Sequence, residues 1–598
     1  MKKIDAVFTI FLLLLAVSVS QAQNNNYELS KPLDLKLAGV NKVLQMSNGN
    51  TLLFHFEPSK AITVKVFDHS RKEIASRQEW CHYLDIYLIQ DARFKGLFEI
   101  GGEAVLFFDQ QNMIGRHRLV RLRFSGTDGQ LKDETVLAES KSNEKRIRFY
   151  VMNNKLKGKY AVLYAMVENF RRKADLNVEY FSSSHEVERT VQLDVDRSRF
   201  DYLDITGADY LDCGVVVSLA LSKVLQNGTI SHGNTYGPAG SFPGPIVPDA
   251  SQTTSDNLYL TPPARGSRYA DQQSENYDEF DPTPSRFRHI LSVYFIPEDG
   301  SPIKKKDVDA TPDIYPYHSF LTHNDFSNAI NLLLFSYKDA YVMYGLDRLP
   351  AAVMDNIFLR LDDKDLKTTI NPIRNQMANK YLQEKTDSSK IFLGAAVASS
   401  TNQYGLSTLV SESFTRYANT ESRLRPRLFE TWLGDIAITR FDDDGKELYG
   451  AVIPRAQYYK SYKHYYYSGQ LSAKWHDQML LDDLPEQVYN RQFISLNVFT
   501  QAKNSFLILN DADRNFNLNA GKTCDSVYLF ENTNAVYYTI NSKKELTRNY
   551  VFGKPLRGEY KCSFIEGADF DDKTAEYAAL IQYKKGGSIS LRMAWAHL

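Results

Sequence analysis

A hairpin-like pattern recurs about eight times along the chain, and it constrains the fold more than any other feature. Each copy has an apolar strand, a short polar turn and a second strand that is richer in charge. The copies span residues 64–74, 122–131, 176–187, 293–303, 357–366, 436–448, 536–546 and 580–589. Asp-Gly and Gly-Gly pairs supply the positive φ that tight hairpin turns need, so these segments are predicted hairpins.

A more apolar run without strong alternation precedes most of the copies. These runs span residues 52–56, 104–108, 161–167, 215–221, 330–335, 406–414 and 506–509. A short apolar run is typical of a strand buried on both faces, and an alternating one of a half-buried strand. A propeller blade needs this gradient, because its inner strands lie between neighbouring blades while its outer strand faces water.

Self-similarity at about 45 to 65 residues predicts an all-β fold, a β-propeller of seven or eight blades. Tandem β-sandwiches also have short strands at regular spacing, but a sandwich has no reason to repeat at this period. A parallel β-helix would repeat at a much shorter one. With 43% hydrophobic and 13% aromatic residues among 598, the chain can bury a large core.

The N-terminus has the features of a cleaved secretory signal over residues 1–22. Lys2 and Lys3 precede an apolar stretch, and Ser20 and Ala22 place small residues before a cleavage site at Gln23. The alternative, a membrane anchor, needs a longer apolar segment. We therefore expect an exported protein, periplasmic or extracellular, with no transmembrane segment after cleavage and with residues 23–598 forming one propeller domain.

Charge and cysteine content narrow the possible partners and ligands. The net charge of −1 argues against the basic field that nucleic-acid binders show. The four cysteines, Cys81, Cys213, Cys524 and Cys562, lie in different repeats without CxxC spacing. A metal cluster is not expected, and both disulfides and free buried thiols remain open.

Three segments depart from the repeat, and such departures are where function resides on repeat scaffolds. Residues 226–288 are rich in Gly, Pro, Ser, Asn and Asp, and we interpret them as an insertion within one blade. This insertion is either a disordered surface loop or a lid or partner-binding loop.

The second departure, residues 371–385, predicts a short peripheral helix. Asn371 would be its cap and Pro372 its first residue, with Ile373, Met377 and Tyr381 on one face.

The third departure is a cluster of aromatic residues in an expected inter-blade loop. It contains Tyr458, Tyr459, Tyr462, His464, Tyr465, Tyr466 and Tyr467. Tyr combines an apolar face with a hydroxyl and suits surfaces that bind glycans or proteins, so these residues are the candidate binding site. The alternative is that they pack between blades.

Motifs for common catalytic chemistry are missing from the sequence: there is no G-x-S-x-G, HExxH, Walker-type or G-x-G-x-x-G motif. His318, His323 and Asp325 have a spacing that fits neither a helix face nor a strand face. The segment 511–517 has the oxygen spacing that opens a calcium loop, but it lacks the sixth-position Gly, and Lys522 stands where the bidentate Glu belongs. We expect no catalytic residues, no cofactor and no metal.

Three segments of the sixth repeat carry a family resemblance. Residues 409–414, 435–446 and 452–457 together resemble uncharacterised exported bacterial β-propeller-like repeat proteins. The resemblance covers about one blade well and implies a propeller fold and export, but no activity or site residues. We expect a non-catalytic exported scaffold that binds a protein or glycan of the cell envelope. The alternatives are a polysaccharide hydrolase or lyase, whose residues would come from separate blades, and a structural part of an envelope assembly.

Overall fold

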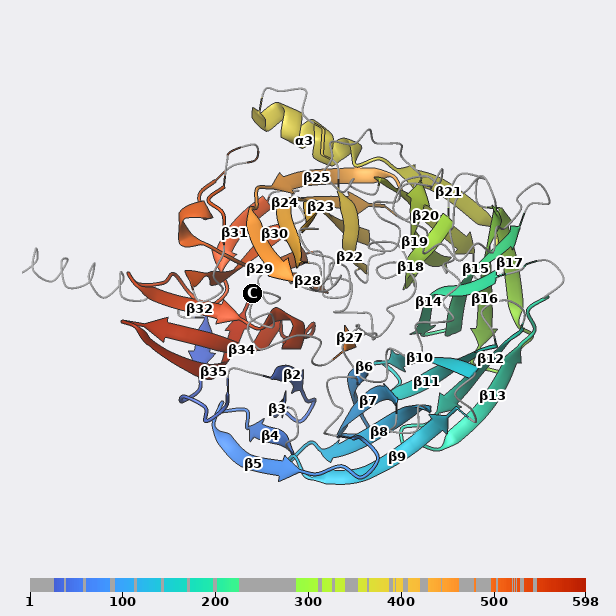
Figure 1. The fold of residues 1–598 in the computed structure, drawn as a ribbon, viewed down its shortest axis with the longest axis horizontal. Helices are drawn as coiled ribbons and strands as arrows, with labels where there is room; N and C mark the ends of the chain where they lie inside the picture. The colour runs from blue at the N-terminus through green and yellow to red at the C-terminus, as the bar shows by residue number, and fades with distance from the viewer. Residues whose placement is uncertain are drawn as a thin grey trace, which may run out of the picture.

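The computed structural model describes residues 26–36, 39–57, 61–85, 92–111, 116–140, 145–168, 173–196, 200, 202–224, 287–309, 315–324, 329–338, 353–362, 365–386, 391–392, 394–401, 407–419, 428–442, 444–461, 478–479, 496–501, 504–518, 520, 522, 524–527, 532–540 and 546–598. The strands within these ranges form eight antiparallel sheets arranged in a ring (Figure 1). Each sheet is one blade, so the all-β propeller is confirmed. Of the seven or eight blades that the sequence predicts, the described residues form eight.

Blades 1 to 4 follow one another along the first half of the chain. Blade 1 has β2 (Val40–Gln45), β3 (Thr51–Phe56), β4 (Ile62–Phe67) and β5 (Glu73–Glu79). Blade 2 has β6 (Arg93–Ile100), β7 (Glu103–Gln111), β8 (His117–Ser125) and β9 (Leu131–Glu139), with β27 (Gln478–Met479) beside β6. Blade 3 has β10 (Lys145–Asn154), β11 (Lys159–Glu168), β12 (Lys173–Phe181) and β13 (Val187–Leu193). Blade 4 has β14 (Tyr202–Leu211), β15 (Gly214–Val224), β16 (Phe287–Pro297) and β17 (Lys304–Asp309).

Blades 5 to 8 complete the ring. Blade 5 has β18 (Tyr315–Asn324), β19 (Ala329–Lys338), β20 (Val353–Asp362) and β21 (Thr368–Ile373). Blade 6 has β22 (Ala395–Thr401), β23 (Ser407–Asn419), β24 (Leu428–Phe441), β25 (Glu447–Ile453) and β26 (Gln457–Ser461). Blade 7 has β28 (Leu496–Gln501), β29 (Asn504–Asp511), β30 (Asn534–Ile540) and β31 (Leu546–Tyr550), with the 3₁₀ turn η6 (Asp513–Asn515) after β29. Blade 8 has β32 (Glu559–Ser563), η8 (Ile565–Gly567), β33 (Asp569–Asp571), β34 (Glu576–Lys585), β35 (Ser588–His597) and β1 (Tyr27–Leu29).

The two ends of the chain meet in blade 8 and close the ring. Tyr27 of β1 pairs with Ala596 of β35, and the Ser30 hydroxyl accepts a hydrogen bond from the backbone N–H of Met593 at 2.9 Å. In blades 1 to 7 the predicted hairpins fall on the third strand and the turn that leads to the fourth. In blade 8 the predicted hairpin is β34–β35, the second and third strands, because the N-terminus supplies the fourth.

Second strands form the core between blades, as their apolar runs predict. All six residues of β3 are buried. Phe54 of β3 meets Phe124 of blade 2 edge-on at 5.1 Å, and Phe56 meets Phe108 at 5.6 Å. These aromatic contacts join neighbouring sheets face to face, so much of each blade's stability comes from the blade beside it.

The peripheral helix exists, but it begins later than predicted. It is α3 (Gln376–Thr386), whereas Asn371 and Pro372 belong to β21, the edge strand of blade 5, where a proline costs no sheet hydrogen bond. The cap comes from elsewhere in the chain, because the Glu447 carboxylate accepts the backbone N–H of Met377 at 2.9 Å. The helix lies on β25 of blade 6, with Ala378 and Leu382 buried.

Several sequence predictions fall partly or wholly outside the described residues. Residues 1–22 lie outside them, as do residues 226–286 of the insertion, and Val224 and Phe287 on either side of the undescribed segment pair between β15 and β16. In the described part of the chain, no helix is long and apolar enough to cross a membrane.

All four cysteines are described, and none forms a disulfide. Cys562 is buried, and its Sγ lies 2.9 Å from the Thr533 hydroxyl.

Candidate functional site

The predicted tyrosine cluster is only partly described. Tyr458 and Tyr459 lie in β26, where their backbones pair with Trp432 and Thr431 of β24, and the Tyr458 side chain is half-buried. The remaining members, Tyr462, His464, Tyr465, Tyr466 and Tyr467, lie outside the described residues. Their role as a binding surface stays a prediction.

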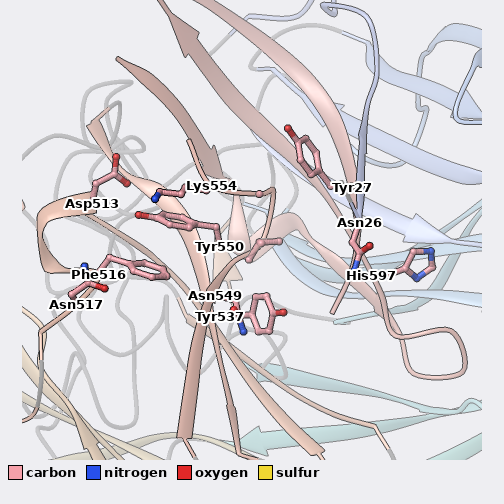
Figure 2. Close-up of a pocket in the computed structure, with 12 residues that line it drawn as sticks. Asn26, Tyr27, Asp513, Phe516, Asn517, Tyr537, Asn549, Tyr550, Lys554 and His597 are labelled. Atoms are coloured by element: carbon pink, nitrogen blue, oxygen red, sulfur yellow. The ribbon is translucent and has the colours of Figure 1, made fainter. Parts of the chain in front are cut away.

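A cavity of about 520 Å³ lies between blades 7 and 8. Five parts of the chain line it: the N-terminal segment, the loop after β29, β30, the segment from β31 into the following loop, and the end of β35 (Figure 2). The lining residues are Asn26, Tyr27, Asp513, Phe516, Asn517, Tyr537, Asn549, Tyr550, Val551, Gly553, Lys554 and His597. None of them belongs to the predicted site.

One wall of the cavity is a stack of aromatic rings. The Phe516 and Tyr550 rings are 4.2 Å apart and nearly parallel, and the Arg548 guanidinium lies 4.8 Å from the Phe516 ring. Arg548 donates from Nη2 to the buried Asp511 carboxylate at 2.7 Å. Asp511 also accepts a hydrogen bond from the Asn515 side-chain amide at 3.0 Å. Because Asp511 belongs to β29 and Arg548 to β31, these bonds fix the loop that carries Phe516 to both strands.

A carboxylate and a phenol meet at the rim of this wall. The Tyr550 hydroxyl hydrogen-bonds Asp513, which also accepts the Asn534 amide at 2.7 Å. Burial raises the pKa of Asp513 above its ordinary value, with the nearby Asp511 adding to the shift. Burial together with Asp513 raises the pKa of Tyr550 to about 12, so its hydroxyl is neutral at physiological pH.

Tyr537 and Asn549 lie between the two walls in Figure 2. The Tyr537 hydroxyl is hydrogen-bonded to the Asn549 side chain, and burial raises its pKa. Both residues come from the outer half of blade 7, on β30 and β31. An amide and a neutral phenol together offer donors and acceptors within one small area.

Asn26 and Tyr27 of the N-terminal segment form the opposite wall together with His597 of β35 (Figure 2). The Tyr27 hydroxyl accepts a hydrogen bond from the Lys561 ammonium at 3.1 Å. Gly553 has φ +68°, and a Cβ built on it would lie 2.7 Å from the Tyr27 ring. Tyr27 can therefore approach only because residue 553 has no side chain.

The loop that resembled a calcium site belongs to the aromatic wall of the cavity, and its polar groups are bound by other protein groups. Both Asp511 oxygens accept protein donors, Arg548 on one and Asn515 on the other. Asn515 in turn bonds the backbone of Asp525, and Asp525 pairs with Arg514 at 2.9 Å. Throughout the described residues, no group of three or more His, Cys, Asp or Glu is arranged to hold a metal.

Sequence reasoning missed the cavity because its walls are distant along the chain. Residues 26–27 and 597 meet only when the ring closes, and no local pattern signals that contact. The one available signal was the segment 511–517, whose oxygen spacing resembles the start of a calcium loop and which carries Phe516.

Comparison with known proteins assigns this chain to no family. No family model and no curated protein matches the chain. The WD40 domain of SCAP from fission yeast is 7% identical and covers 96% of this chain and 98% of its own, with a TM-score of 0.32. The polysaccharide lyase Uly1 is 9% identical, covering 85% and 90%, with a TM-score of 0.34. The β-propeller domain of the Trilobed protease from Pyrococcus furiosus is 7% identical, covering 68% and 94%, with a TM-score of 0.28.

Proposed function

We propose that the protein is a non-catalytic, exported β-propeller scaffold that binds a glycan of the cell envelope in the cavity between blades 7 and 8. The observation that supports this is the lining: aromatic rings on two walls, with amide, phenol, carboxylate and ammonium groups around them. A sugar ring has apolar C–H faces and a rim of hydroxyls, so it needs both kinds of group. The volume lies within the range of small-ligand sites.

Binding fits the titration properties of the two phenols in this cavity better than turnover does. A general base works best when its pKa is close to the ambient pH. The phenols of Tyr537 and Tyr550 have raised pKa values, so they stay protonated at neutral pH. The Asp513 carboxylate is engaged by Asn534 and Tyr550. The two phenols are therefore suited to hold hydroxyls rather than to move protons.

The proposal is tested with the double variant Asn549→Ala/Lys554→Ala, because both side chains are exposed and line the cavity. Isothermal titration with cello-, xylo-, chito- and galacturono-oligosaccharides should identify a ligand of the wild type. The variant should bind that ligand at least about tenfold more weakly, since each lost hydrogen bond contributes about 1 kcal/mol.

Lys380→Ala on the exposed face of α3 serves as the matched control and should bind like the wild type. Binding by none of the four oligosaccharides, or unchanged binding by the double variant, would contradict the glycan site. Cleavage of any oligosaccharide by the wild type would contradict the non-catalytic assignment and favour a hydrolase or lyase.

A further inference from the structure

A loop on the outer rim of blade 1 exposes two aromatic side chains. It follows β5 and runs from Trp80 to Asp85, beside blade 2. The Trp80 side chain is 58% exposed and that of Tyr83 is 47% exposed. Singly scattered apolar side chains are normal on a surface, but here two large aromatic side chains stand three residues apart on one loop.

Hydrogen bonds to blade 2 hold this loop in place. The Glu134 carboxylate of β9 accepts three successive backbone N–H groups, from His82 at 2.5 Å, Tyr83 at 2.6 Å and Leu84 at 2.7 Å. Charge-assisted bonds of this kind are the strong ones. A single carboxylate therefore fixes the backbone on which Tyr83 stands.

Two buried side chains fix the end of the loop. Leu84 is only 1% exposed and packs into the core shared by blades 1 and 2. Buried Gln110 pairs with the backbone of Asp85 in both directions, donating to its carbonyl and accepting its N–H, each at 2.8 Å. The loop is thus preorganised, and little conformational entropy would be lost when the aromatic pair binds a ligand.

On the described strand beside it, β5, the surroundings of the aromatic pair are polar. Along β5, Ser76 and Gln78 are exposed between Trp80 and the next exposed apolar side chain, Ile74. Ile74 and Trp80 are six positions apart along the chain, which is about 20 Å in an extended strand. A stable protein interface needs about 800 Å² per partner with an apolar centre, and the described residues of this rim do not provide one.

Nearby charges favour an uncharged ligand. Glu79 and Glu134 are both close enough to raise the pKa of the Cys81 thiol beyond the effect of its burial. Two carboxylates beside the loop would repel a polyanion. A neutral polysaccharide chain instead presents C–H faces to aromatic rings and hydroxyls to the polar strand around them.

We propose that Trp80 and Tyr83 form a surface platform for a neutral polysaccharide chain, separate from the cavity between blades 7 and 8. The platform shares its ligand class with the proposed function but depends on none of its residues. Two contact points on one propeller would retain a long chain better than either alone, because the second contact forms at high effective concentration.

Native affinity electrophoresis in gels containing hydroxyethylcellulose, xylan or laminarin tests the platform. At least one of these neutral polymers should retard the full-length protein. The variant Trp80→Ala/Tyr83→Ala should lose this retardation, with an apparent affinity at least about tenfold lower. Trp80→Phe should retain part of it. Both side chains are exposed, so the melting temperature should stay unchanged.

Ile74→Ala is the matched control, because it removes an exposed apolar side chain from the same blade edge. The cavity variant Asn549→Ala/Lys554→Ala should still be retarded, which separates failure of the platform from failure of the cavity. Absence of retardation by all three polymers, or equal retardation of Trp80→Ala/Tyr83→Ala, would overturn the proposal. So would stronger retardation by polygalacturonate, or Trp80-dependent capture of an envelope protein without polysaccharide binding.

Discussion

Gly450 of β25 lies directly against Ala378 of α3, so close that a Cβ built on Gly450 would stand 2.1 Å from the backbone nitrogen of Ala378. Ala378 is fully buried at this contact. The helix therefore rests on blade 6 through two of the smallest residues, backbone against backbone. Glu447, three residues earlier on the same strand, caps the start of the helix.

Replacing Gly450 with alanine should displace α3 from blade 6. The added methyl group has no room, so we expect the free energy of unfolding to fall by about 2 to 3 kcal/mol, as overpacked interfaces do. Urea denaturation measures the change. Gly558→Ala is the comparison: Gly558 has φ +73° but no atom within 4 Å of a built Cβ, so only about 1 kcal/mol should be lost. Equal losses would show that the contact is not tight.

Removing Arg548 should destabilise blade 7 strongly. Its partner Asp511 is 1% exposed and would be left as a buried charge in Arg548→Met. We expect the free energy of unfolding to fall by about 3 kcal/mol or more. Arg514→Met is the matched control, since the Arg514–Asp525 pair is 63% and 57% exposed and should contribute less than about 1 kcal/mol. Comparable losses in guanidinium denaturation would contradict this difference.

Tyr27 should contribute to the closure of the ring. In Tyr27→Ala, the buried Lys561 ammonium loses a hydrogen-bond partner and Phe552 loses an edge-on aromatic neighbour at 6.5 Å. We expect a loss of about 3 kcal/mol and faster amide hydrogen exchange in β1 and β35. Glu28→Ala changes an exposed residue of the same strand and should leave both measurements unchanged. Unaltered exchange in Tyr27→Ala would show that closure does not depend on this side chain.

Acidification should destabilise the protein through His185. Burial and the neighbouring Arg121 and Arg123 lower the pKa of His185 to about 4, against the opposing effect of Glu103 at 3.5 Å. Above pH 6.5 the histidine is neutral in both states and contributes nothing. As the pH falls from 6.5 to 4, the unfolded chain takes up a proton that the folded chain excludes, so stability falls by about 2 to 3 kcal/mol.

The pH dependence is isolated by comparison with His185→Gln. Urea denaturation from pH 7.5 to 4 should show a shallower decline for the variant, because glutamine does not titrate. Glu103, whose pKa is lowered, adds its own loss of stability only as the pH falls below its ordinary value of 4.5, and it does so in both proteins. Parallel curves over pH 6.5 to 4 would contradict the role of His185.

Short sequence patterns predicted the structure correctly where neighbouring residues alone determine it, as in the hairpin turns. Gly129 and Gly445 turn the predicted hairpins with φ of +71° and +78°, as their Asp-Gly-type turns require. The helix start was wrong because Asn371 and Pro372 suit an edge strand as well as a helix N-terminus. The deciding group, Glu447, comes from another blade. A cap supplied by a distant strand leaves no mark in the sequence near the helix.

The sequence by itself determined the repeated hairpins, the buried second strands and hence the propeller, because these depend on turn conformation and hydrophobic periodicity over a few residues. Only the tertiary structure decided where the cavity lies. Tyr27 and His597 share that cavity because the N-terminal strand closes blade 8. Ring closure depends on how all the blades pack together, and no short segment of the chain encodes it.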